Sequence, residues 1–235
     1  MTQFMGELIG TAMLIILGDG VVANVVLNRT KGHNSGWIVI TMGWGLAVFV
    51  SVFTVAAVSG AHINPAVTIG LAFAGKFAWS SVPLYIAAQM IGAAVGAFLV
   101  WVFYKKHFEI TDDKDLKLAV FCTAPEIRTN LNNFISEVIG TFILVYAVLH
   151  LATPEVGLGA VNALPVGLLV VAIGLSLGGT TGYAINPARD LAPRIIHALV
   201  PIPNKRDADW GYAWIPVAGP VVGGILAALL AINVM

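Results

Sequence analysis

The tripeptide Asn-Pro-Ala occurs twice in the chain, as Asn64, Pro65 and Ala66 and again as Asn186, Pro187 and Ala188. Asn is a preferred residue at a helix N-cap, and Pro suits the first helical position. Each tripeptide therefore predicts the start of a helix, where free N–H groups place a partial positive charge. The Asn amide can also donate a hydrogen bond to water or to a hydroxyl. We expect each Asn to cap its helix and to bind a passing oxygen atom.

The composition indicates a protein that crosses a membrane several times. Of 235 residues, 58% are hydrophobic and only 10% are charged, whereas soluble domains carry about 25% charged residues. The 12 basic residues balance the 12 acidic ones, so nothing suggests nucleic-acid binding. The single cysteine, Cys122, excludes an intrachain disulfide. No metal-ligand spacing, phosphate loop or nucleophilic triad emerges, so we expect no metal, no cofactor and no enzyme activity.

Six apolar runs are long enough to cross the hydrocarbon core, about 30 Å thick, which takes about 20 helical residues. They lie near 4–27, 37–58, 83–103, 134–152, 162–178 and 212–234. Two shorter apolar stretches, near 65–75 and 187–199, each begin with the Pro of a tripeptide. These predict half-helices that enter the membrane and leave again. The expected fold is an all-α polytopic membrane protein with six transmembrane helices and two re-entrant half-helices.

The chain also repeats itself. Residues 6–11 resemble residues 136–141, which places Glu7 and Glu137 at matching positions. Glycines four residues apart, which favour close helix packing in lipid, also recur in both halves: Gly92 and Gly96, then Gly219 and Gly223. Because each half holds three spans, the halves have opposite orientations. We predict an inverted repeat of residues 1–115 and 116–235, with the permeation site between the halves.

The segments before the tripeptides have no helical pattern. At membrane depth, such backbone is tolerated where it lines a water-filled path or is buried in protein. We therefore expect a row of carbonyl acceptors that face the solute, contributed by Gly60, Ala61, His62, Ile63, Gly182 and Ala184.

The paired tripeptides, the repeated glutamates and the six-plus-two layout resemble the aquaporin and aquaglyceroporin family over essentially the whole chain. Asp190, Arg194 and Pro216 also match the glycerol-conducting branch. The resemblance implies a passive channel and a homotetramer with one pore in each subunit.

The resemblance also places a selectivity constriction at Trp44, Gly174, Tyr183 and Arg189. Water-selective members of the family have His at the position of Gly174, so Gly removes that bulk. Trp44 and Tyr183 are expected to form an apolar wall, opposite the hydrogen-bond donors of Arg189. Tyr183 stands where glycerol facilitators typically have Phe, which leaves the range of solutes open.

Three carboxylates fall within the predicted spans, where ionisable groups are functional candidates. A proton relay is conceivable for Glu7 and Glu137. Their matching positions favour a structural role instead, in which they accept hydrogen bonds from N–H groups of the irregular segments, and the resemblance implies the same. Asp19 has three open roles: lining an outer vestibule, lining a subunit interface, or lying protonated and paired inside the fold.

The function expected from these features is passive diffusion of glycerol and similar small uncharged solutes, with some water. Two half-helix N-termini at mid-membrane would repel cations and protons. Three alternatives stay open: a channel for undissociated lactic acid or dihydroxyacetone, a strict water channel, and a carrier with alternating access, since inverted repeats also occur in carriers.

The expected partners are small neutral solutes, water and the lipids of the plasma membrane. The distribution of basic residues alone places the termini outside, because only Lys76 lies on their side of the membrane. The other basic residues of the early loops lie opposite: Arg29, Lys31, Lys105, Lys106, Lys114, Lys117 and Arg128. The resemblance implies cytoplasmic termini, and we adopt that orientation as the expectation.

Overall fold

The computed structural model describes residues 1–151, 157 and 159–234. Within these ranges, six helical segments are long and apolar enough to cross a membrane. They are α1 (Gln3–Val26), α2 (Trp37–Ser59), α4 (Val82–Ile110) with the preceding 3-10 turn η1 (Trp79–Ser81), α6 (Asn130–Leu149), α7 (Leu164–Leu177) with the preceding 3-10 turn η2 (Gly159–Ala163), and α9 (Ile215–Val234). The predicted polytopic all-α fold is confirmed. Residue 152, at the end of the predicted fourth span, and residue 235 lie outside the described residues.

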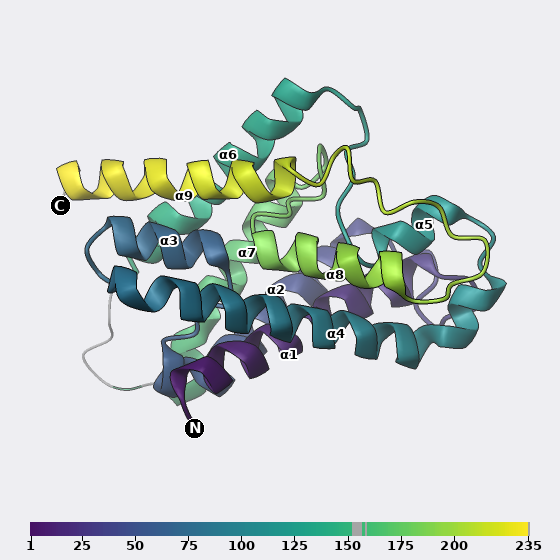
Figure 1. Ribbon diagram of the computed structural model, residues 1–235, viewed down its shortest axis with the longest axis horizontal. Coiled ribbons are helices and arrows are strands. Elements are labelled where there is room, and N and C mark those ends of the chain that lie inside the picture. Colours follow the sequence, from purple (N-terminus) through teal and green to yellow (C-terminus); the bar gives the residue numbers. More distant parts are fainter. Residues whose placement is uncertain (152–156, 158, 235) are drawn as a thin grey trace.

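The two tripeptides begin the two short helices, α3 (Pro65–Phe73) and α8 (Pro187–Leu199). Figure 1 shows α3 and α8 end to end in the middle of the molecule, between α4 and α9. Each begins with Pro after an extended Asn N-cap, whose side chain accepts from backbone N–H groups. The local sequence therefore sets where both half-helices start.

The connection between the halves contains more helix than the sequence predicts. Helix α4 continues to Ile110 rather than ending near 103, because its charged last turns extend beyond the apolar run. Lys105 lies over the Trp101 ring, and Lys106 pairs with Glu109 at 2.7 Å. Helix α6 begins at Asn130 rather than near 134.

A short helix, α5 (Lys114–Ala119), lies in the connection that the sequence predicts to be a loop. The Asp113 carboxylate caps it by accepting from the N–H groups of Asp115 and Leu116. Six residues are too few to give a clear periodic signal, which is why the pattern misses this helix.

Glycines bring the backbones of two helix pairs close together. A Cβ on Gly96 of α4 would lie 2.7 Å from the Ala12 carbonyl oxygen of α1. A Cβ on Gly219 of α9 would lie 2.7 Å from the Glu137 Cβ of α6. Side chains this small let helices approach in lipid, where packing drives association. The close α1–α4 and α6–α9 pairs frame the two half-helices.

Candidate permeation site

The two Asn side chains link the half-helices to each other. The Asn64 amide nitrogen donates to the Ile185 carbonyl at 2.8 Å, and the Asn186 amide nitrogen donates to the Ile63 carbonyl at 2.9 Å. The oxygen of each Asn caps its own helix, at 2.8 Å from the N atom of Ala66 and 3.0 Å from that of Ala188. An amide has two N–H groups. One of the two is used across the motifs.

A cavity of about 220 Å³ passes both Asn side chains. The six residues expected to offer carbonyls all line it: Gly60, Ala61, His62, Ile63, Gly182 and Ala184. Apolar side chains from the spans also line it, namely Val48, Val52, Leu144, Val148, Val166 and Val170. The cavity therefore combines polar groups with an apolar surface, which suits a molecule that carries hydroxyls on a carbon chain.

Residues 60–63, which we call the first loop segment, and residues 182–185, the second loop segment, have strained backbones. Ile63 has a φ of 44° and Ile185 a φ of 43°. Positive φ is a real outlier for a β-branched residue. Such conformations persist only where surrounding contacts hold them.

In the first half, those contacts come from Glu7, whose side chain is fully buried. One carboxylate oxygen accepts from the Ser59 hydroxyl at 2.7 Å and from the N–H of His62 at 2.9 Å. The other accepts from the N–H of Ile63 at 2.7 Å and from the Gln89 amide at 2.8 Å. Four donors occupy this carboxylate, an arrangement that favours holding the loop over relaying a proton.

In the second half, Glu137 makes the corresponding contacts. One oxygen accepts from the Thr181 hydroxyl at 2.7 Å and from the N–H of Ala184 at 3.0 Å. The other accepts from the N–H of Ile185 at 2.8 Å. Both loop segments are thus fixed by a carboxylate from the first helix of their own half.

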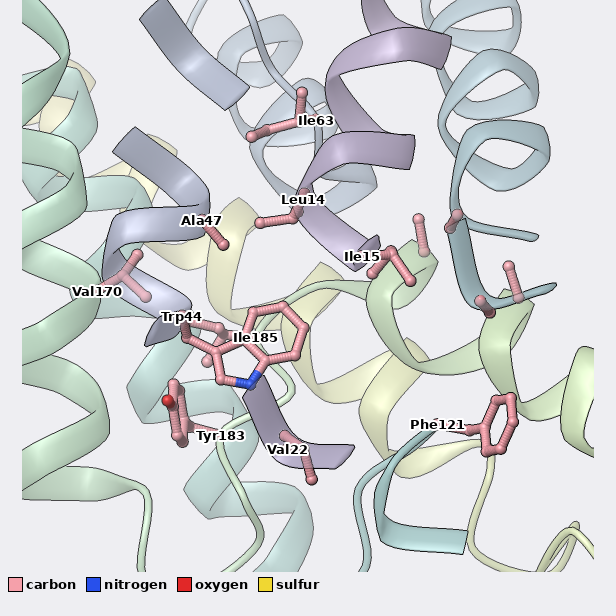
Figure 2. Packing of buried hydrophobic residues seen from close by; sticks show 14 of the residues in the cluster. Leu14, Ile15, Val22, Trp44, Ala47, Ile63, Phe121, Val170, Tyr183 and Ile185 are labelled. Carbon is pink, nitrogen blue, oxygen red and sulfur yellow. The ribbon is translucent and has the colours of Figure 1, made fainter. Parts of the chain in front are cut away.

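Three of the four predicted constriction residues line the cavity: Trp44, Tyr183 and Arg189. The guanidinium carbon of Arg189 lies 4.2 Å from the centroid of the Trp44 ring. Its Nη1 donates to the Phe121 carbonyl at 3.2 Å. Figure 2 shows the Trp44 and Tyr183 rings near each other, with Val170 at one side. Two aromatic rings and one cation therefore line this part of the cavity.

Gly174, the fourth predicted residue, lies behind Tyr183. A Cβ on Gly174 would be 2.7 Å from Cζ and 2.8 Å from the hydroxyl oxygen of Tyr183. The Gly174 carbonyl accepts from the Trp37 indole at 3.0 Å, and the Trp37 and Tyr183 rings meet edge to face. The absence of a side chain at Gly174 therefore makes room for the Tyr183 ring. Gly174 affects the cavity indirectly, because it sets where that ring can lie.

Sequence reasoning misses the part that Phe121 plays. Its segment is tied to α8 because the Asp190 carboxylate accepts from the N–H and the hydroxyl of Thr123, both at 2.7 Å. Arg194 donates to Asp190 at 2.9 Å and to the Thr123 carbonyl at 2.8 Å. The Asp190–Arg194 spacing of four residues on a helix was the available signal. The Phe121 carbonyl gave no signal in the sequence, because every residue has a backbone carbonyl.

Asp19 lies inside the fold and pairs with Arg189. Its side chain is fully buried, and one carboxylate oxygen is 3.5 Å from Nη1 of Arg189. Of the three roles that the sequence left open, the geometry favours a paired residue within one subunit.

Comparison with known proteins identifies the family of this chain. The family model for major intrinsic proteins matches residues 1–231. The chain belongs to this family. Major intrinsic proteins are channels, so this protein is a multi-pass membrane channel and not an enzyme.

Among its relatives are two glycerol facilitators. The chain is 60% identical to a probable glycerol uptake facilitator protein of Thermotoga maritima, over 98% of both chains. It is 55% identical to a glycerol uptake facilitator protein of Streptococcus pneumoniae, again over 98% of both. A D/L-lactic acid transporter of Lactiplantibacillus plantarum is 41% identical, over 96% of this chain and 94% of that one.

The fold is also that of a solved structure. The aquaglyceroporin from Plasmodium falciparum superimposes with a TM-score of 0.86 at 32% identity, covering 99% of this chain and 95% of the other. The predicted resemblance to aquaglyceroporins is confirmed.

Proposed function

We propose that this major intrinsic protein is a passive channel for glycerol and similar small uncharged solutes, with some water. The observation that carries the proposal is the mixed lining of the cavity, in which Arg189, the two Asn residues and the loop segments accompany apolar side chains from the spans. Glycerol carries hydroxyls on a carbon chain, so it can use both the polar and the apolar lining. The glycerol facilitators at 60% and 55% identity support the same solute.

Ion exclusion follows from the two half-helices and Arg189. Helices α3 and α8 place their N-termini, capped by Asn64 and Asn186, at the middle of the protein. Their dipoles give this region a partial positive charge that opposes cations and protons. Neutral hydroxyls need only hydrogen-bond partners, which the Asn amides supply.

The test is solute flux into proteoliposomes, measured by stopped-flow light scattering with water, glycerol and urea against protein-free liposomes. We expect glycerol permeability at least about tenfold above the lipid background, rising linearly with concentration because a channel does not saturate at low occupancy. Saturation at low glycerol together with counterflow would show a carrier. Water flow without glycerol entry would show a strict water channel.

A second candidate solute is undissociated lactic acid, which has similar size and hydroxyl pattern. It is favoured by the lactic acid transporter at 41% identity. Lactate flux that rises as the external pH falls toward the pKa of the acid would support it. Equal flux at two pH values on either side of that pKa would exclude the neutral acid as the species conducted.

We also propose a homotetramer in the plasma membrane, with cytoplasmic termini and an inverted repeat of residues 1–115 and 116–235. The matching order of α1 to α4 and α6 to α9, each set containing a half-helix, supports the repeat. Native mass spectrometry of the protein in detergent tests the homotetramer and should give four chains.

Protease protection tests the orientation. A C-terminal tag should be cleaved by protease in inside-out vesicles and protected in right-side-out vesicles.

A further inference from the structure

Asp19 is a fully buried carboxylate in the membrane-spanning helix α1. Its side chain has no exposed surface, and its Oδ1 is 3.5 Å from Nη1 of Arg189. Its Oδ2 has no hydrogen-bond partner among the described residues. A carboxylate in a transmembrane helix is costly, so a partner is needed to retain it.

The packing of α1 brings Asp19 behind the constriction. The neighbouring Gly18 lies directly against the Trp44 ring, because a Cβ there would overlap the ring atoms. Trp44 in turn lies beneath the Arg189 guanidinium, at 4.2 Å. Helix α1 therefore comes close enough for Asp19 to reach the same Arg from the protein side.

The other nearby carboxylate, Asp190, is already occupied. Its oxygens accept from Arg194, the Thr123 N–H and the Thr123 hydroxyl. Among the described residues, Asp19 is the one carboxylate within hydrogen-bond distance of Arg189. The pairing is thus specific to Asp19 and Arg189.

Both protein acceptors of the Arg189 side chain, the Asp19 carboxylate and the Phe121 carbonyl, lie at Nη1. A guanidinium carries five N–H donors in a fixed plane. Holding one nitrogen from behind therefore sets the direction of the others. Within the described part of the chain, no hydrogen bond to protein is made by Nη2 or Nε of Arg189, while Arg189 itself lines the cavity.

We propose that Asp19 is a positioning residue for Arg189, which it holds at Nη1 so that the remaining guanidinium N–H groups face the solute. This inference rests on the proposed function as a glycerol channel. A polyol has several hydroxyls that can accept from adjacent guanidinium N–H groups, whereas water has a single oxygen. Loss of the positioning contact should therefore reduce glycerol flux more than water flux.

The experiment compares Asp19→Leu, Asp19→Asn and the wild-type protein in proteoliposomes, with fluxes divided by the amount of folded channel. Leu has a similar shape but no acceptor, whereas Asn keeps one acceptor oxygen. We expect D19L to lower glycerol permeability at least about fivefold and water permeability less than about twofold, as the loss of one charged hydrogen bond implies. D19N should keep glycerol permeability within about twofold of wild type. Ser51→Ala, which truncates a buried hydroxyl that has no hydrogen-bond partner among the described residues, is the matched control and should leave the glycerol-to-water ratio unchanged.

The same substitution in an Arg189→Val background tests the mechanism. If Asp19 acts through Arg189, D19L should change the glycerol-to-water ratio by less than about 1.5-fold once Arg189 is absent. An equal effect in both backgrounds, or an equal loss of water and glycerol flux in D19L, would overturn the inference. Wild-type vesicles that admit no glycerol would instead overturn the proposed function.

Discussion

The ring of Tyr183 occupies the space beside Gly174, where a Cβ would lie 2.7 Å from the ring carbon that bears the hydroxyl. The Trp37 indole fixes both residues, since it donates to the Gly174 carbonyl and packs edge to face on Tyr183. Trp37, Gly174 and Tyr183 are therefore one packing unit at the side of the cavity. The identity of either Gly174 or Tyr183 restricts the other.

Gly174→His should destabilise the protein, because the imidazole and the Tyr183 ring cannot share this space. Overpacking of a fitted site costs about 1–3 kcal/mol. We expect a lower melting temperature in detergent and reduced glycerol flux. Tyr183→Ala in the same chain should restore stability, while glycerol flux stays low because the imidazole remains. Gly179→Ala, at a position with open space around it, is the control and should melt like wild type. Normal stability and full glycerol flux in G174H would contradict this assignment.

Glu7→Gln and Glu137→Gln should each loosen a loop segment. The substitution replaces an acceptor oxygen with an NH₂ group, which then faces a donor such as the N–H of Ile63 or Ile185. A buried donor left without its acceptor costs about 1–3 kcal/mol. We expect a loss of this size in the free energy of unfolding, measured in mixed micelles, with water and glycerol fluxes reduced together. Glu109→Gln, in the surface pair with Lys106, should change it by less than about 0.5 kcal/mol. A change in proton leak without any loss of stability would point to a relay instead.

Arg194→Met should be among the most damaging single changes in this protein. It leaves the fully buried Asp190 without its cation, and breaking a buried pair costs about 3–5 kcal/mol. The segment that carries the Phe121 carbonyl should also loosen, so glycerol flux should fall in the protein that remains folded. Arg206→Met removes the partner of the exposed Asp115 and should cost about 0–1 kcal/mol. Similar unfolding free energies for the two variants would refute the role of the buried pair.

Cys122 should resist thiol reagents in the folded protein. Burial is the main cause that raises the pKa of this thiol well above its usual range, and the nearby Asp190 carboxylate raises it further. We expect less than about 10% labelling by N-ethylmaleimide at pH 7.5 in detergent, because the thiolate is the reactive form, and full labelling after denaturation in SDS. Ser35→Cys, at an exposed position, should label readily under the same conditions.

The same thiol gives stability a dependence on pH. The thiol of the unfolded chain has a pKa of about 8.5 and loses its proton there, whereas the thiol of the folded protein still holds its proton at that pH. Unfolding should therefore become easier as pH rises above that value toward the folded pKa. Cys122→Ala should reduce this slope in the free energy of unfolding, and an identical slope in both proteins would contradict the assignment.

The sequence by itself determined the spans, the starts of the half-helices and the matching positions of Glu7 and Glu137 in the two halves. These features depend on local chemistry: the length of an apolar run, an Asn before a Pro, and an internal repeat. The sequence did not predict the charged last turns of α4 or the short helix α5, because hydropathy gives no signal in these polar segments.

Only the tertiary structure decided what stands behind the constriction. It placed Tyr183 against Gly174, the Phe121 carbonyl on Arg189, and Asp19 on the same guanidinium from 170 residues away in the chain. The physical reason is that these contacts depend on how α1, α2, α7 and α8 pack together. A backbone carbonyl or a buried carboxylate carries no sequence mark of the partner that packing brings to it.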